Sequence, residues 1–151
     1  MKRLLLLPLV ALAACGPRPA PPVQDAAVTV TDAWCRPTPN GARAGACYAA
    51  FTAATDDRLT GGSSPRAAQL QIHEMSMAGG VMRMGEMKDG LPLPAGKTVT
   101  LAPGGNHIML IGLTGPLVEG ETAPLTLRFA SASEVTVQAP VRAPSIDHAG
   151  H

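Results

Sequence analysis

Aromatic residues and net charge are both scarce in this chain. Its 151 residues include one Trp, one Tyr and two Phe, and the formal net charge is +1 at pH 7. Loss of Lys2 and Arg3 with a leader peptide would leave a charge of about −1. Such a weak field attracts neither the phosphate backbone of nucleic acid nor acidic lipid. We therefore exclude nucleic acid as a partner.

Internal repeats, long amphipathic helical patterns and membrane-spanning apolar runs are also missing. The apolar run at residues 4–14 follows Lys2 and Arg3, and it is too short to remain as a transmembrane anchor. A charged start and a short apolar run are typical of a secretory signal peptide. We therefore predict a signal peptide over residues 1–14, and the remaining length suits one domain with its own core.

Cys15 directly follows a Leu-Ala-Ala sequence, an arrangement that resembles a bacterial lipobox. The resemblance implies that the Cys15 sulfur carries a diacylglyceryl group, and more than one acyl chain gives stable anchoring. We therefore expect a lipid-anchored protein of the periplasm. Gly16 favours the outer membrane, because it does not resemble an inner-membrane retention signal.

Composition divides the mature chain into three parts. The proline-rich stretch 15–25 is expected to form a semi-rigid tether that holds the domain off the membrane. Residues 26–142 are predicted to form the domain, and residues 143–151 a flexible tail.

β-Strand patterns dominate the domain. Its segments alternate apolar and polar residues, or combine β-branched and aromatic residues, between Gly- and Pro-rich turns. They are residues 28–34, 46–51, 67–73, 81–87, 97–101, 107–111, 124–129 and 134–138. Composition predicts loops over residues 56–65 and 90–96. About eight short strands predict an all-β Greek-key β-sandwich in a single domain.

Cys35 and Cys47 are the two cysteines of the predicted domain. A three-residue loop at 40–42 between the first two strands would place them directly opposite each other. In an oxidising compartment this pairing predicts a disulfide, which would stabilise the domain by about 3 kcal/mol in the chain-entropy model. Two free thiols in a core, or two thiolate metal ligands, are the alternatives.

Histidine and methionine are concentrated in two short pieces, residues 73–84 and 107–109. Together they hold two of the four histidines and five of the seven methionines. Thioether sulfur is a poor ligand for hard cations and zinc but a good one for Cu(I), and neutral imidazole suits several first-row metals. The composition therefore predicts a copper site. The alternative is that methionine fills irregular gaps in a core with few aromatics.

The first piece is predicted to form a hairpin around residues 78–80. The shared face is the same whether the two-residue turn is 78–79 or 79–80. Its residues are His73, Met75, Met77, Met82 and Met84. The first turn would place His73 directly opposite Met84, and the second would place Met75 there.

The second piece places His107 and Met109 two residues apart on a strand, and therefore on one face, with Ile108 directed to the core. Each histidine thus has a methionine on its own face beside a Gly-rich turn. Loops at one end of such folds carry their sites. This coincidence favours metal ligands over isolated gap-filling methionines.

Several motifs together resemble the periplasmic copper chaperone family PCu(A)C. They are Asp-Ala-Trp-Xaa-Arg-Pro-Thr-Pro at 32–39, His-Glu-Met-Ser-Met-Xaa-Gly-Gly-Val-Met at 73–82, Met84, Pro-Gly-Gly-Xaa-His at 103–107, Met109 and Pro-Leu-Thr-Leu at 124–127. The resemblance covers residues 26–141. It implies a cupredoxin-like β-sandwich that binds one Cu(I) and delivers it to the CuA centre of cytochrome c oxidase, directly or through another copper chaperone.

Carried over by position, the resemblance also implies a ligand set. The Cu(I) ligands would be His73, Met84, His107 and Met109. The strand pattern leaves Met75, Met77 and Met82 as auxiliary or docking residues. Twenty-two residues separate Met84 from His107, one more than the family pattern has. In a loop the extra residue is harmless, but in a strand it would turn the ligands to the other face.

We expect a monomeric Cu(I) carrier and not an enzyme. Thioethers suit an oxidising compartment because they cannot be lost to disulfide formation, and no set of nucleophile, base and orienting group stands out. The main alternative is a lipoprotein that buffers copper or confers resistance without a dedicated acceptor. A blue-copper electron carrier would need a Cys thiolate beside two histidines, and a metal-free adhesion or assembly module is the last alternative.

The tail contains the other two histidines, His148 and His151. They predict either a solvated end of the chain or an auxiliary Cu(II) site, as on extended members of the family.

Overall fold

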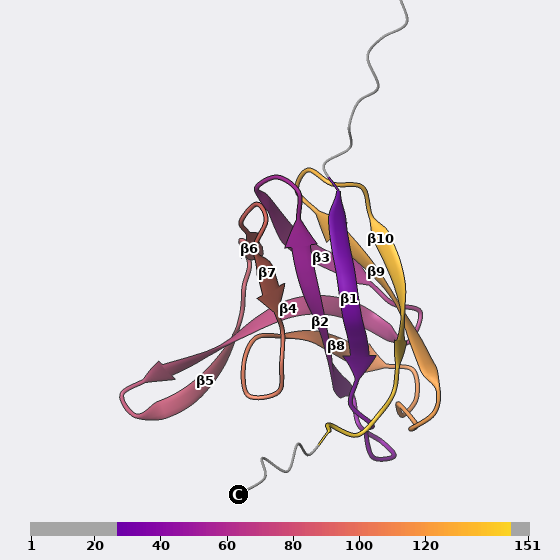
Figure 1. Cartoon of the computed structure of the whole chain (residues 1–151). Coiled ribbons are helices and arrows are strands. Elements are labelled where there is room, and N and C mark those ends of the chain that lie inside the picture. The colour runs from indigo at the N-terminus through magenta and orange to yellow at the C-terminus, as the bar shows by residue number, and fades with distance from the viewer. Residues whose placement is uncertain (1–26, 146–151) are drawn as a thin grey trace, which may run out of the picture.

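Residues 27–145 form an all-β domain in the computed structural model (Figure 1). Its strands are β1 (Val28–Cys35), β2 (Ala44–Ala53), β3 (Asp57–Ser63), β4 (Ala67–Ala78), β5 (Val81–Glu86), β6 (Leu91–Leu93), β7 (Thr98–Thr100), β8 (His107–Leu113), β9 (Thr122–Phe129) and β10 (Val135–Pro140). The predicted signal peptide, Cys15, the tether, His148 and His151 lie outside the described residues. Within residues 27–145, no helix has the length and apolar character needed to span a membrane.

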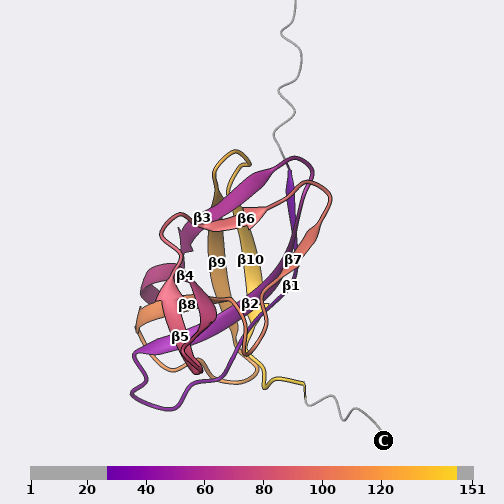
Figure 2. The same ribbon diagram turned by 90° about the vertical axis from the view of Figure 1, so that its left-hand side faces the viewer.

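The strands form one strongly curled sheet in the order β1-β2-β8-β4-β3-β9-β10, with β5, β6 and β7 paired to β4, β3 and β2. Neighbours such as β2 and β8 are distant in sequence, which is the Greek-key arrangement. The two ends of the order meet, because β1 and β10 lie side by side (Figures 1 and 2) and Cys35 forms a parallel bridge with Val141. The predicted all-β Greek-key sandwich is therefore confirmed.

The core inside the curled sheet is mainly aliphatic. Alternate residues of β9, including Leu125 and Leu127, are fully buried. The two phenylalanines, Phe51 and Phe129, meet edge to face with ring centroids 6.4 Å apart. Met87 packs against this core, so the gap-filling interpretation is right for that methionine.

The first hairpin has the predicted register, with Cys35 directly opposite Cys47. The two residues are fully buried and joined in a disulfide. The alternatives of free thiols and of thiolate metal ligands are therefore wrong. A blue-copper site loses support with them, because neither cysteine is free to bind a metal.

Two stretches predicted as loops contain strands, β3 and β6, and the sheet therefore has ten strands instead of about eight. Leu59 in β3 and Leu93 in β6 are fully buried, so packing decides where composition suggested a loop. Gly62 lies so close to β9 that an added Cβ would be 2.2 Å from the Thr126 carbonyl oxygen. Glycine in this strand therefore permits a close approach of two backbones.

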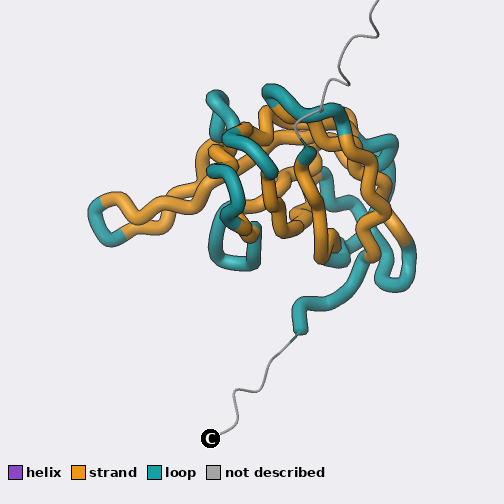
Figure 3. Tube along the Cα trace, turned by 45° about the horizontal axis from the view of Figure 1, so that its top comes forward, coloured by secondary structure: helices purple, strands orange, loops and turns teal. Residues whose placement is uncertain are grey.

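Strands β4 and β5 form a long hairpin that projects from the body of the domain (Figures 1 and 3). Its turn consists of Gly79 and Gly80, whose φ angles are +59° and +78°. A tight hairpin turn of this kind needs positive φ at both central residues, which glycine adopts without strain. Of the two predicted turns, the structure therefore has the second.

The register follows from that turn. Met75 lies opposite Met84, and His73 lies opposite Glu86. The first predicted register, with His73 directly across from Met84, is wrong. The prediction that the histidine and the methionines share one face is confirmed, because it held for either turn.

Candidate metal centre

Two imidazoles meet where β4 pairs with β8. His73 lies directly opposite His107, and their ring centroids are 5.7 Å apart with the ring planes inclined by 53°. The two strands are neighbours in the sheet although they are distant in sequence. The fold thus brings two of the four ligand candidates together.

The turn before β8 fixes the ring of His107. This residue is only 7% exposed, and its Nδ1 lies 3.1 Å from the carbonyl oxygen of Gly105. A carbonyl oxygen only accepts hydrogen bonds, so the contact assigns the proton to Nδ1. Nε2 of His107 therefore has its lone pair available for a metal.

The ring of His73 is held through Nε2, whereas that of His107 is held through Nδ1. Nε2 lies 2.9 Å from Oε1 of Gln71, and the amide nitrogen of Gln71 donates to Gln69 at 3.4 Å. With Oε1 as the acceptor, Nε2 of His73 carries the proton. The lone pair of His73 is then on Nδ1.

That Nδ1 atom is buried and has no hydrogen-bond partner. A buried polar atom without a partner costs about 1–3 kcal/mol, and a bound cation would satisfy it. The orphaned Nδ1 of His73 and the free Nε2 of His107 are therefore a pair of nitrogen donors suited to a metal.

The charge state of His73 also suits ligation. Burial lowers the pKa of His73 below its ordinary value, the neighbouring His107 lowers it further, and Glu86 partly opposes both effects. The ring therefore stays neutral to a lower pH than free histidine does. Only the neutral form binds a metal.

Met109 supplies a thioether close to this pair. It is half-buried on β8, two residues from His107, and in register it lies between Ala46 of β2 and Gln71 of β4. A shallow depression that also includes Arg36 borders Met109. Met109 therefore borders a surface depression on the side of β2.

Met84 approaches from the projecting hairpin and is 52% exposed. Because His73 faces Glu86, Met84 is the diagonal neighbour of His73. Diagonal neighbours across a strand pair lie about 7–8 Å apart, within reach of long side chains. The fold thus places Met84 within reach of His73 but not directly across from it.

The longer spacing between Met84 and His107 does not turn His107 and Met109 to the core face of β8. Ile108 and Leu110 are fully buried in the core, and His107 and Met109 alternate with them on the opposite face. The predicted common face of His107 and Met109 is therefore confirmed.

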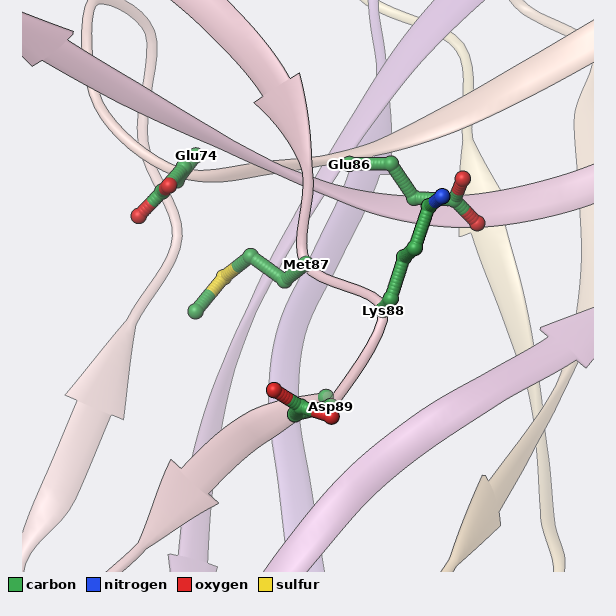
Figure 4. A pocket seen from close by; sticks show the side chains of 6 residues that line it. Glu74, Glu86, Met87, Lys88 and Asp89 are labelled. Carbon is green, nitrogen blue, oxygen red and sulfur yellow. The ribbon is translucent and has the colours of Figure 1, made fainter.

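A hollow at the base of the hairpin is lined by side chains unlike the imidazole and thioether donors described above. Its lining residues are Glu74, Glu86, Met87, Lys88, Asp89 and Gly90 (Figure 4). It presents mainly carboxylates and an ammonium group, which do not favour Cu(I). Nowhere in residues 27–145, this hollow included, do three His, Cys, Asp or Glu side chains converge as a metal site.

The sequence pattern did not single out Gln71 and Glu86 as residues of the site. Gln71 could have been found, because it precedes His73 by two residues and shares its strand face. Glu86 could not, because its place opposite His73 depends on which hairpin turn forms.

Comparisons with known proteins agree with this geometry. Residues 28–141 match the family described as "Putative lipoprotein LpqE-like". The protein named "Putative lipoprotein Lxx21020" from Leifsonia xyli subsp. xyli (strain CTCB07) is 38% identical over 122 residues, which are 81% of this chain and 74% of that protein.

Two solved structures with similar folds have names that mention bound copper. The copper-bound PCuAC domain from PmoF2 is 30% identical, with a TM-score of 0.63 over 78% of this chain and 93% of that one. The structure of CuI-DR1885 from Deinococcus radiodurans is 29% identical, with a TM-score of 0.54 over 80% of this chain and 79% of that one. These likenesses confirm the cupredoxin-like β-sandwich. By the match over residues 28–141 and the 38% identity, the chain belongs to the LpqE-like family.

Proposed function

We propose that this domain is a copper chaperone that binds one Cu(I) tightly through His73, Met84, His107 and Met109. The observation that carries the proposal is the imidazole pair, in which the buried Nδ1 of His73 lacks a partner and Nε2 of His107 is free. Thioethers on the same face complete a donor set suited to Cu(I). The names of the similar solved structures support the choice of metal.

The four ligands differ in how firmly they are held, and this difference suggests how copper leaves. The two imidazoles are fixed by hydrogen bonds to Gly105 and Gln71, whereas Met84 lies on an exposed strand. Acceptor ligands would replace the thioethers one at a time while the imidazoles still hold the ion. Neither thioether binds a proton, so this exchange needs no proton transfer at sulfur.

The copper acceptor and the cellular location of the protein are parts of the same proposal. The resemblance to PCu(A)C favours the subunit of cytochrome c oxidase that carries CuA, or another copper chaperone. Cys15 would anchor the protein by lipid outside the cytoplasm, and the names of the family and of the Leifsonia relative support this. We infer a carrier and not an enzyme.

Anaerobic titration with Cu(I) against a chromophoric chelator tests the site. Wild type should bind one equivalent tightly, and the variants His73→Ala, Met84→Leu, His107→Ala and Met109→Leu should each weaken that binding. Met87→Leu is the matched control, because Met87 packs against the core and not beside the imidazoles. Equal affinity in wild type and all four variants would refute the proposed ligand set.

A transfer experiment separates the chaperone from the buffering alternative. The copper-loaded domain should load the apo CuA domain of an oxidase faster than the same concentration of chelated Cu(I) does. In cells, loss of the protein should lower oxidase activity under copper limitation. Copper sensitivity with normal oxidase activity would instead favour a buffering lipoprotein.

A further inference from the structure

The projecting β4–β5 hairpin exposes apolar side chains that the proposed copper site does not use. The large hydrophobic residues exposed on the described domain are Met77, Val81, Met82, Met84 and Val118. All but Val118 lie on this hairpin. Strand β5 pairs only with β4, so its outer edge has no strand partner within residues 27–145, and the hairpin projects from the domain (Figures 1 and 3).

The methionines of the hairpin are gathered on one face. Met75 lies opposite Met84, and Met77 lies opposite Met82. Residues directly opposite on antiparallel strands have Cβ atoms about 4.5–5.5 Å apart, and the next pair on the same face follows about 7 Å along the strand. Four flexible thioether side chains thus lie on one face within the span of two residue pairs.

The other face of the hairpin has no sulfur. Its residues alternate with the methionines and are Glu74, Ser76, Ala78, Val81, Arg83 and Gly85. Methionine is not a residue that strands favour for its shape, and these side chains fill no core. A property that the four share, and that the other face of the hairpin lacks, is the soft thioether sulfur.

We propose that Met75, Met77 and Met82 form a second Cu(I) site at the outer end of the hairpin. Three thioethers suit Cu(I) and not zinc or hard cations, and no carboxylate stands between them on this face. The site lacks imidazole, so it binds more weakly than the site at His73 and His107. It shares the metal of the proposed function but none of its nitrogen ligands.

The position of Met84 links the two sites. It stands opposite Met75 in the hairpin and diagonal to His73, so its sulfur can face either group. Copper would enter or leave through the exposed methionines and reach the imidazoles by exchange of one thioether at a time. The ion remains Cu(I) throughout, so no electron donor or acceptor is needed.

Methyl NMR on protein labelled at the methionine ε-carbons tests the proposal. During anaerobic titration with Cu(I), the first equivalent should shift the Met84 and Met109 methyls. The second equivalent should shift the Met75, Met77 and Met82 methyls. A titration with Zn²⁺ should leave the three hairpin methyls unmoved.

Variants test the same point by stoichiometry. Met77→Leu with Met82→Leu should reduce the bound copper from two equivalents to one, whereas Val81→Leu, on the opposite face of the hairpin, should keep both. His73→Ala should weaken the first equivalent and spare the second. Saturation of wild type at one equivalent, with no shift of the Met77 and Met82 methyls, would overturn the second site and leave the proposed function intact.

Discussion

His73 and His107 lie directly opposite each other on the paired strands β4 and β8, yet they are held through different ring nitrogens. His73 donates from Nε2 to Gln71, and His107 donates from Nδ1 to Gly105. The two lone pairs are therefore on Nδ1 of one ring and Nε2 of the other. Hydrogen bonds to the protein set this asymmetry before any metal binds.

Gln71→Leu tests the role of the glutamine at His73. We expect Cu(I) affinity to fall by about 10- to 100-fold, the usual effect of losing a group that orients a metal ligand. Without the acceptor, the proton of His73 is free to move between its nitrogens. Nitrogen-15 NMR of the apo protein should show Nε2–H in wild type and a mixture of both forms in the variant.

Gln69→Leu is the control for this experiment. Gln69 accepts a hydrogen bond from Gln71 but does not contact His73 in the structure. Its variant should therefore keep most of the affinity and the Nε2–H form. If Gln71→Leu and Gln69→Leu behave alike, Gln71 does not orient His73.

The pH dependence of His73 follows from its surroundings. Burial and then His107 lower the pKa of His73, and Glu86 raises it. Glu86→Gln removes the opposing negative charge, so the pKa should fall further below its ordinary value of about 6.5. A proton NMR titration of the imidazole measures both pKa values, and Glu74→Gln, which changes a residue on the other hairpin face, should leave the pKa unchanged.

The lowered pKa of His73 also affects the stability of the fold. A lowered pKa means that the unfolded chain binds more protons than the folded one between the pKa of folded His73 and about 6.5. The free energy of unfolding of the apo protein should therefore fall as the pH decreases through that window, and this contribution should level off below it. His73→Gln removes this contribution, so its stability should change less over the window. An equal pH dependence in both proteins would contradict the assignment.

Parts of the site followed from the sequence because strand periodicity is simple. The common face of His107 and Met109, and that of His73 with Met84, required only that side chains alternate. The direct contact of His73 with His107 did not follow, because β4 and β8 are distant in the chain and pair only through the Greek-key order. The resemblance to PCu(A)C supplied that link.

Strands β3 and β6 were not predicted for a different reason. β3 contains Asp57, Gly61 and Gly62, which composition assigns to a loop. In the fold, the Asp57 carboxylate accepts backbone hydrogen bonds from Ser131 at 2.9 Å and Ala132 at 2.8 Å. The residues that look like loop formers thus make contacts with β9 and the segment after it, and no local pattern contains that information.

Removal of the disulfide should destabilise the domain without abolishing copper binding. Cys35→Ala with Cys47→Ala opens a loop with a sequence separation of 12, and we expect a loss of about 3 kcal/mol in the free energy of unfolding. Urea denaturation measures it, and reduced wild type should resemble the double variant. Cu(I) affinity should persist because neither cysteine belongs to the imidazole pair; a lost Cu(I) site in the still folded variant would contradict this.

Gly62→Ala tests whether glycine in β3 is needed for strand packing. The added Cβ would be 2.2 Å from the carbonyl oxygen of Thr126, so the strands must separate. We expect the free energy of unfolding to fall by about 1–3 kcal/mol or more, as in other overpacked interiors. Gly85→Ala on β5 is the matched control, since its Cβ would meet nothing within 4 Å. Urea denaturation should show little change or a small gain for Gly85→Ala; similar midpoints for both variants would show that β3 and β9 can separate at little cost.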